Sequence, residues 1–371
     1  MQGILPNFTV TFIITLMAIA ALQPAARYIG LVDRPGGRKS HDGEVPLIGG
    51  LSMLAGLMLA GLVAAFVPSL PPMSINSSLV VGALFLGLVG AIDDRFDLPP
   101  ALRLVAQGLA GFAAIAGGTV VHSLGNYSGS EVALGILAVP FTLLTFMAFT
   151  NAFNWQDGSD GIAGGQALIV FASLLIVESA SGSTAHSHLI VALIGCVVAF
   201  LVFNAPFAQK VGSYRLFMGD AGALFLGFAL AWFAIVMSQG PDAVIAPVTA
   251  LWFGAVPVLD FFGSMVRRVA MRRNPLAADA EHLHHLLRRA GLTRRRLFAV
   301  EMTACATFAG IGLLGHFMQV GELPMLLGMV VVAVLYYWVF CSGRFFQREG
   351  EAPRSNPGRW YWALPPTARP R

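Results

Sequence analysis

The sequence is poor in charged residues and in cysteine. Only 11% of its 371 residues are Asp, Glu, Lys or Arg, whereas soluble domains carry roughly 25%. This scarcity excludes an ordinary water-soluble domain, and the apolar content excludes a disordered chain. The three cysteines, Cys196, Cys305 and Cys341, lie in or at the ends of apolar runs without paired spacing. We therefore expect neither a disulfide framework nor a zinc site.

What the sequence has instead is a series of long apolar runs, with 56% hydrophobic residues overall. A helix needs about 20 apolar residues to cross a bilayer. Division of the runs at their Pro, Gly and Ser clusters predicts eleven spans, centred near residues 18, 58, 85, 111, 142, 170, 197, 229, 254, 308 and 333. The first run lacks a basic segment and a cleavage site, so it is interpreted as a retained span.

These features predict an all-α polytopic membrane protein with about eleven transmembrane helices and an active site formed by cytoplasmic loops. Residues 1–343 are expected to form one membrane domain, and residues 344–371 a disordered or interfacial cytoplasmic tail. The 41 glycines suit close packing between helices in lipid.

The distribution of basic residues predicts the orientation of the chain. Five of the connections between predicted spans contain no Lys or Arg, so all 23 basic residues fall on the other side. By the positive-inside rule that side is cytoplasmic, with the N-terminus outside and the C-terminus inside. The net charge of +4 follows from this asymmetry and indicates no nucleic-acid partner. Nine arginines between Arg267 and Arg296 form a basic patch that could attract anionic lipid or phosphate, or could simply signal topology.

Acidic residues are costly near hydrocarbon, so polar clusters at the ends of spans are candidate site residues. The first cluster contains Asp93, Asp94 and Asp97, with Arg103 following it. Adjacent carboxylates repel each other unless a cation offsets their charge. Oxygen ligands of this kind suit Mg²⁺ bound jointly with substrate phosphates. The alternative is a solvated loop that merely ends a helix.

The second cluster runs from Asn151 to Gly161 and joins the fifth predicted span to the sixth. It contains two amides, Asn151 and Asn154, and two carboxylates, Asp157 and Asp160, each pair spaced by three residues. Its glycines would let the backbone approach a ligand closely. This density of polar groups between two apolar spans is difficult to explain by packing.

Two further clusters lie on the predicted cytoplasmic side. Asp220 stands at the mouth of the eighth predicted span, where a carboxylate could also be a plain partner of the helix dipole. His282, His284 and His285 follow Asp279 in the arginine-rich loop. The imidazoles could bind zinc, act as acid or base, or donate to phosphate oxygens. Because the nearby arginines would repel a metal cation, we favour contact with phosphate, although His284 could have no role.

Carboxylates for Mg²⁺, basic residues for phosphate, and a location at the inner membrane face together indicate phosphoryl transfer. The membrane location implies that at least one substrate is a lipid. Two other classes stay open at this point. One is a Mg²⁺-dependent membrane prenyltransferase, which would need a second acidic motif, and the other is a transporter, which would place its polar groups at the bilayer midplane.

The motifs resemble the polyprenyl-phosphate N-acetylhexosamine-1-phosphate transferases, and within that family its WecA-type branch. The resemblance covers about residues 30–300, and it rests on motifs that all occur in this order: Gly30-Leu31-Val32-Asp33-Arg34-Pro35, Pro46-Leu47-Ile48-Gly49-Gly50, Asp93-Asp94-Arg95-Phe96-Asp97, Asn151-Ala152-Phe153-Asn154, Asp157-Gly158-Ser159-Asp160-Gly161, Phe217-Met218-Gly219-Asp220-Ala221-Gly222 and His282-Leu283-His284-His285.

The resemblance implies transfer of GlcNAc-1-phosphate from UDP-GlcNAc to undecaprenyl phosphate in the bacterial inner membrane, with release of UMP. This reaction would start a cell-envelope glycan such as O-antigen or common antigen. It further implies Mg²⁺ as cofactor, with Mn²⁺ as a substitute. A homodimer is a possible assembly of the chain.

The roles that the resemblance assigns fall into three groups: Asp220 and Asn154 as magnesium ligands; Asp93, Asp94, Asp157 and Asp160 as catalytic residues; and Asp97, Arg103, Asn151, Arg268, Asp279, His282, His284 and His285 as substrate-binding residues. Lys39 and His41 in the first cytoplasmic loop are looser candidates. Direct attack of the lipid phosphate on the β-phosphorus is the favoured mechanism, and a two-step route through an aspartyl phosphate is the alternative.

One departure bears on the donor sugar. The peptidoglycan branch of the family uses UDP-MurNAc-pentapeptide and has three consecutive histidines, whereas this chain has His-Leu-His-His at 282–285. This difference favours a GlcNAc-type donor, with another UDP-N-acetyl sugar as the alternative.

Overall fold

The computed structural model describes residues 3–34, 43–73, 76–207, 215–274 and 282–341. Within these ranges the chain is mostly helical. The helices are α1 (Leu5–Ile29), α2 (Gly49–Phe66), α3 (Ser77–Phe96), α4 (Pro100–Ala116), α5 (Ala138–Gln156), α6 (Ile162–Ser181), α7 (Ser187–Asn204), α8 (Gly219–Val236), α9 (Pro247–Phe253), α10 (Ala255–Ala270), α11 (Leu283–Arg289), α12 (Arg294–Phe317) and α13 (Glu322–Tyr336). The described strands form two antiparallel pairs, β1 (Val32–Asp33) with β2 (Val45–Pro46) and β3 (Ser123–Tyr127) with β4 (Ser130–Ala133).

The helices agree well with the predicted spans. Ten of the eleven predicted centres fall inside a helix, and the centre near 254 falls on the break between α9 and α10. Among the described residues, nine helices are long and apolar enough to cross a membrane. The pair α9 and α10, bent by 85°, would make a tenth if it is one broken span. The all-α polytopic fold is confirmed, while the count of eleven stays a prediction because α4 has only 17 residues.

The bend between α9 and α10 has a local cause. Gly254 ends α9, and Pro257 lies in the first turn of α10. Proline is tolerated in a first turn because the N–H groups there have no partner within the helix. The two residues thus allow one apolar run to fold as two helices at a steep angle.

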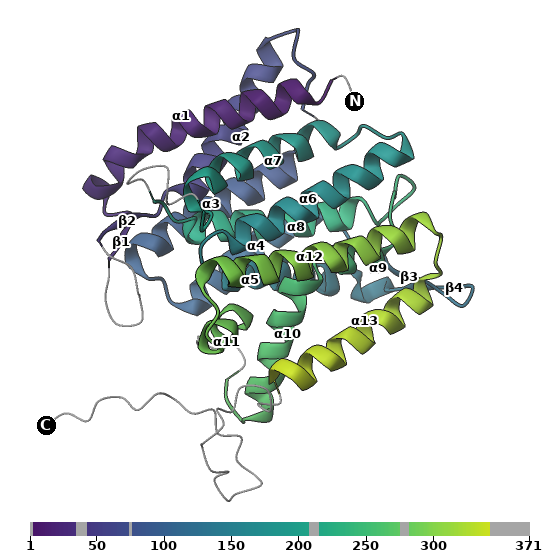
Figure 1. The fold of residues 1–371 in the computed structure, drawn as a ribbon. Helices are drawn as coiled ribbons and strands as arrows, with labels where there is room; N and C mark the ends of the chain where they lie inside the picture. Colours follow the sequence, from purple (N-terminus) through teal and green to yellow (C-terminus); the bar gives the residue numbers. More distant parts are fainter. Residues whose placement is uncertain (1–2, 35–42, 74–75, 208–214, 275–281, 342–371) are drawn as a thin grey trace, which may run out of the picture.

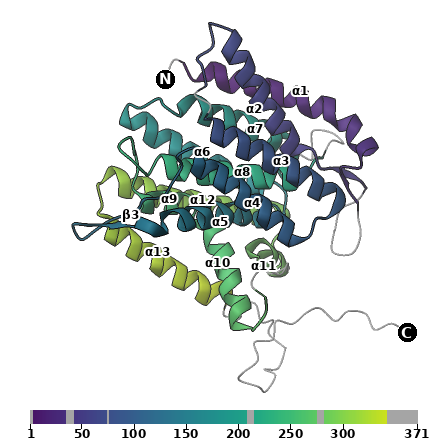
Figure 2. The ribbon, with the colours of Figure 1, turned by 180° about the vertical axis from the view of Figure 1, so that it is seen from behind.

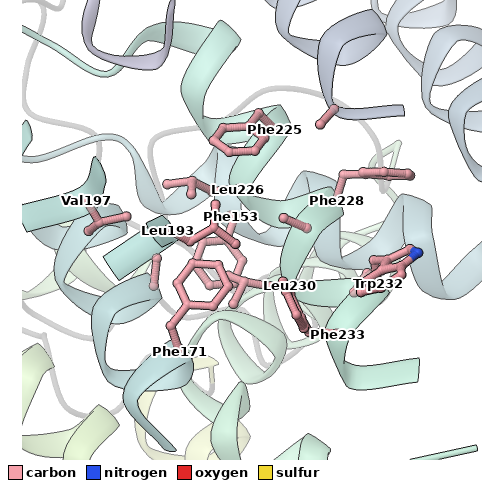
Figure 3. Close-up of a cluster of buried hydrophobic side chains, with 14 of the residues drawn as sticks. Phe153, Phe171, Leu193, Val197, Phe225, Leu226, Phe228, Leu230, Trp232 and Phe233 are labelled. Atoms are coloured by element: carbon pink, nitrogen blue, oxygen red, sulfur yellow. The ribbon is translucent and has the colours of Figure 1, made fainter. Parts of the chain in front are cut away.

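Helix α8 forms the core of the bundle. Its side chains are mostly buried, and it packs against α2, α3 and α5. Figure 3 shows its aromatic side chains packed with Phe153 of α5, Phe171 of α6, and Leu193 and Val197 of α7. In Figures 1 and 2, α1 lies at one edge of the bundle and α13 at the opposite edge, with α8 between them.

Glycines set how closely α8 approaches its neighbours. A Cβ on Gly50 of α2 would lie 2.0 Å from the backbone nitrogen of Gly222. A Cβ on Gly90 of α3 would lie 2.4 Å from the backbone nitrogen of Ala221. The first turn of α8 therefore rests against the backbones of two other helices, as close packing in lipid requires.

The two ends of the bundle differ. At one end, which we call the site end, α3 and α5 finish and α4, α6 and α8 begin. The β1–β2 pair and α11 lie toward this end, and the β3–β4 hairpin lies toward the opposite end (Figure 1). The polar clusters found in the sequence lie at this end, because each one is at the beginning or the end of a helix there.

A substitution tests the packing at Gly50. Gly50→Ala should lower the free energy of unfolding by about 1–3 kcal/mol, because the added methyl group meets backbone atoms that cannot rotate away. The matched control is Gly108→Ala in α4, where a Cβ would meet nothing within 4 Å. Thermal melting of the purified proteins in detergent measures both. Equal melting temperatures for the two variants would contradict the packing described here.

Candidate active site

The N-terminus of α8 is capped by a carboxylate from another helix. Asp94 of α3 accepts the backbone N–H of Asp220 at 2.9 Å and that of Ala221 at 3.3 Å. The first N–H groups of a helix lack partners within it, and a negative charge there is stabilised by the helix dipole. Gly219 precedes Asp220 with φ +71°, and a Cβ on it would lie 2.5 Å from an Asp94 oxygen. Asp94 thereby fixes where α8 starts and where Asp220 lies.

A second set of backbone hydrogen bonds holds the segment before α8. Phe217 N–H donates to Pro46 O at 2.9 Å, and Gly49 N–H donates to Phe217 O at 3.0 Å. Gly50 N–H donates to Met218 O at 2.8 Å. The Pro46–Gly50 motif therefore positions the approach to Asp220 through its backbone.

Charged and amide side chains from four helices meet beside Asp220. Arg103 of α4 lies 3.0 Å from an Asp93 oxygen and 3.6 Å from an Asp220 oxygen. Asn154 of α5 donates from Nδ2 to Asp220 Oδ1 at 2.6 Å. The other Asp93 oxygen accepts Leu98 N–H at 2.7 Å. Arg103 thus offsets part of the negative charge that α3 and α8 bring together.

The carboxylate of Asp157 lies in the field of the same cluster. Its burial, and then the negative charges of Asp220 and Asp94, raise the pKa of Asp157 well above its usual range. A positive charge in the cluster would lower that pKa. The acidic cluster therefore favours the binding of a positively charged group or ion beside Asp157.

Asp160 joins three separate segments. One of its oxygens accepts from Arg215, and the other lies 3.3 Å from Arg294 of α12. The next residue, Gly161, donates its N–H to Asn204 of α7 at 2.7 Å. With both carboxylate oxygens engaged by arginines, Asp160 ties the loop between α5 and α6 to the segment before α8 and to α12.

The histidine segment 282–285 packs against this loop. A Cβ on Gly158 would lie 2.2 Å from His284 Nε2, so the imidazole rests directly on the glycine. Burial, and then the neighbouring His285, lower the pKa of His284 to about 3. Burial and His282 lower the pKa of His285 to about 4. Both imidazoles are therefore neutral near pH 7.

A tryptophan contacts both the histidine segment and the buried arginine of α10. The guanidinium carbon of Arg268 lies 4.6 Å from the centroid of the Trp155 ring. The centroid of the His282 ring lies 4.8 Å from the centroid of the Trp155 ring. Trp155 directly follows Asn154, so the end of α5 contributes both to the acidic cluster and to the support of the histidines.

The structure assembles most of the predicted residues at the site end: Asp93, Asp94, Arg103, Asn154, Asp157, Asp160, Asp220, Arg268, His282, His284 and His285. Asp97 is exposed at the end of α3 with φ 53° and takes no part in the contacts above. Asn151 lies one turn before Asn154, where its amide forms a reciprocal pair with Gln107 of α4. Asp279, Lys39 and His41 lie outside the described residues.

Sequence reasoning missed a set of polar residues next to the site. Six are buried, Gln107, Gln156, Gln166, Asn204, Asp260 and Glu301, and two are partly buried, Arg215 and Arg294. For Asp260 and Glu301 a signal was present, because an acidic residue inside an apolar run is rarely incidental. The glutamines gave no signal, since an isolated amide in a span has no distinctive spacing.

Asp220 and Asn154 are the pair best placed to share a metal ion. The amide orientation of an asparagine is assigned from its hydrogen bonds, so a flip of Asn154 would present its oxygen beside Asp220. Among the described residues, no group of three or more His, Cys, Asp or Glu side chains is spaced to hold a metal ion alone. Mg²⁺ does not require such a group, since it is usually held by one or two carboxylates together with water and substrate phosphates.

The fold and the site are those of a multi-pass membrane enzyme whose acidic centre lies at one end of a helical bundle. The family model "Glycosyl transferase family 4" matches residues 76–238. Proteins named undecaprenyl-phosphate alpha-N-acetylglucosaminyl 1-phosphate transferase are similar over most of the chain. The protein of Escherichia coli (strain K12) is 34% identical, over 94% of this chain and 95% of its own. That of Haemophilus influenzae is 36% identical, over 89% of this chain and 92% of its own.

The chain belongs to glycosyl transferase family 4, and within it to the group of these membrane 1-phosphate transferases. The family predicted from the motifs is confirmed. The chain is thus a multi-pass membrane enzyme that transfers a sugar phosphate.

The lowered pKa of His284 predicts a pH dependence of stability. The pKa is about 3 in the folded protein and 6.5 ordinarily, so between these values the unfolded chain binds the proton more readily. Stability should be full above pH 6.5 and should fall below it, by up to about 1.4 kcal/mol per pH unit. His284→Gln should reduce the fall in melting temperature between pH 7.5 and 5.

The matched control is His122→Gln, because His122 is exposed beside the hairpin at the opposite end. It should keep the pH dependence of the wild type. An unchanged pH dependence in His284→Gln would show that this imidazole is not the buried neutral group described here.

Proposed function

We propose that this protein transfers GlcNAc-1-phosphate from UDP-GlcNAc to undecaprenyl phosphate and releases UMP. The observation that carries the proposal is the meeting of Asp93, Asp94, Asn154 and Asp220 beside Arg103 at one end of the bundle. Relatives with this name in their description are similar over almost the full length of the chain. The product would start a cell-envelope glycan.

The chemistry is an in-line attack by one phosphate on another. An oxygen of the lipid phosphate, largely dianionic near pH 7 because its second pKa is about 6, forms a bond to the β-phosphorus. The bond from that phosphorus to the bridging oxygen breaks, and UMP leaves with the electron pair. The reaction depends on the positioning of the two phosphates and on neutralisation of their charge, and it needs no covalent bond to the protein.

The described residues can supply both requirements. Arg103 carries positive charge into the acidic cluster, where it can hold the lipid phosphate beside Asp93 and Asp94. The histidine segment faces the loop that contains Asp157, where neutral imidazoles can donate hydrogen bonds to the diphosphate of the donor. Direct attack needs no carboxylate nucleophile, and Asp157 is the residue to examine for the two-step alternative.

The donor set fits Mg²⁺. The carboxylate of Asp220 and the amide oxygen of a flipped Asn154 are hard oxygen ligands within reach of each other. Mn²⁺ would substitute, because it favours the same ligands. The ion would offset charge on the diphosphate as a Lewis acid.

The site end is proposed to face the cytoplasm of a bacterial inner membrane. The arginines of the described residues gather there, including Arg95, Arg103 and Arg215, while the connections at the opposite end carry Glu131 and Asp242. Under the positive-inside rule this places the N-terminus outside and the C-terminus inside. UDP-sugars are cytoplasmic metabolites, so the orientation brings the site and its donor together.

Two alternatives are weighed against this proposal. Another UDP-N-acetyl sugar would use the same site, and its distinction from UDP-GlcNAc depends on residues that contact the sugar. A Mg²⁺-dependent prenyltransferase would need a second aspartate-rich motif. Asp160 is instead engaged by two arginines, which leaves it poorly suited to that role.

Transfer by the purified protein tests the reaction directly. Radiolabel from UDP-GlcNAc should enter a butanol-extractable lipid in the presence of undecaprenyl phosphate and Mg²⁺, with release of UMP. A chelator should abolish the labelling, and Mn²⁺ should restore it. Labelling from a different UDP-N-acetyl sugar only would correct the donor, and no labelling from any UDP-sugar would refute the proposal.

Substitution tests the metal pair. Asp220→Ala and Asn154→Ala should each lower the rate by about 10²–10³, the usual cost of removing a group that stabilises charge in the transition state. Asp242→Asn, at an exposed position of the opposite end, is the control and should keep full activity. Full activity of Asp220→Ala with unchanged Mg²⁺ dependence would overturn the assignment.

A further inference from the structure

Asp260 of α10 is a buried carboxylate that the reaction described above does not use. It is 1% exposed, yet both of its oxygens are fully engaged. Oδ1 accepts Leu283 N–H at 2.9 Å and the Tyr336 hydroxyl at 2.8 Å. Oδ2 lies 3.0 Å from the Gln156 amide nitrogen and 3.2 Å from His282 Nδ1. Burying a carboxylate is costly unless it is well hydrogen-bonded, and here four donors surround it.

The four donors come from three separate segments of the chain. Gln156 is the last residue of α5 and directly precedes Asp157. His282 and Leu283 begin α11 and the histidine segment. Tyr336 is the last residue of α13. Asp260 therefore connects the histidine segment to the helix that carries Asn154, without contacting the acidic cluster itself.

The contact with Asp260 fixes the ring of His282. A carboxylate only accepts hydrogen bonds, so Nδ1 of His282 must carry the proton. The Ser264 hydroxyl lies 3.3 Å from the same nitrogen, and the ring of Trp155 supports the imidazole. This arrangement selects one tautomer and one ring orientation, in the way that outer carboxylates orient metal-bound and catalytic histidines.

A chain of amides fixes the other side of Asp260. Gln156 accepts from Gln166 of α6 at 3.3 Å, so its amide nitrogen must face Asp260. Gln166 also donates to the fully buried Glu301 of α12 at 3.2 Å. Because each amide is oriented by the next, Asp260 cannot turn away from His282 without breaking several buried hydrogen bonds.

We propose that Asp260 is a positioning residue for donor binding: it holds His282 and the first turn of α11 in the place and tautomer that receive the diphosphate of the UDP-sugar. The proposal rests on the function proposed above. It assigns Asp260 no contact with substrate, and its effect on the reaction passes through His282.

Asp260→Asn tests the proposal, because it keeps the size of the side chain but replaces one acceptor oxygen with a donor. The KM for the UDP-sugar should rise about tenfold, the cost of one well-placed hydrogen bond. The KM for undecaprenyl phosphate should stay at the wild-type value. A merely structural role would instead lower kcat through loss of active protein and leave both KM values unchanged, which would overturn the proposal.

A double-mutant cycle with His282→Ala tests whether Asp260 acts through this histidine. If it does, the double variant should have the same KM for the donor as His282→Ala alone. Independent roles would make the two effects multiply. Asp242→Asn is the matched control for loss of a carboxylate, at an exposed position of the opposite end.

Two further measurements keep the outcomes distinct. If Asp260→Asn fails to fold, Tyr336→Phe removes one donor and keeps the carboxylate, and it should raise the donor KM by about threefold, again without affecting the lipid KM. An unchanged donor KM in Tyr336→Phe would then overturn the proposal. If the wild type is active and Asp260→Asn has the wild-type KM for the donor, only this inference is refuted. If the wild type is inactive with every UDP-sugar, the proposed function is refuted as well.

Discussion

The hydrogen bonds from the first turn of α8 to Asp94 are the interaction on which the site depends. They place the start of the most buried helix against the end of α3. Asp220 is carried on that first turn, so its position is set by backbone atoms of α8 and by a carboxylate of another helix. Without this contact, Asn154 and Arg103 would have no fixed partner on α8.

The same constraint explains why chemistry and packing occupy different parts of the helices. Within the bundle, glycines such as Gly50 and Gly90 allow backbones to touch, and aromatic side chains fill the remaining space. At the site end, the helix termini expose N–H groups and carry the charges. The exceptions are Asp260 and Glu301, which lie among apolar residues and are held by hydrogen bonds to the glutamine chain.

Much of this arrangement could be predicted from the sequence. Apolar runs located the helices, because the length of a span is set by the bilayer, and charge density located the clusters around Asp93, Asn154, Asp220 and His282. The capping role of Asp94 could not be predicted, since a cap donated by a different helix leaves no local pattern. The apolar run around Gly254 predicts one span and does not reveal the bend, because hydropathy does not report direction. The family resemblance assigned Asp97 to the site, where the structure leaves it exposed.

We propose that α3, α5 and α8 together build one metal-dependent transfer site. The most direct test is the anomalous signal of Mn²⁺ in crystals of the protein grown with UDP-GlcNAc. A peak is expected at about 2.1 Å from the Asp220 carboxylate, with Asn154 and phosphate oxygens as further ligands. A peak bound only by the histidines at 282–285, with none at Asp220, would contradict it.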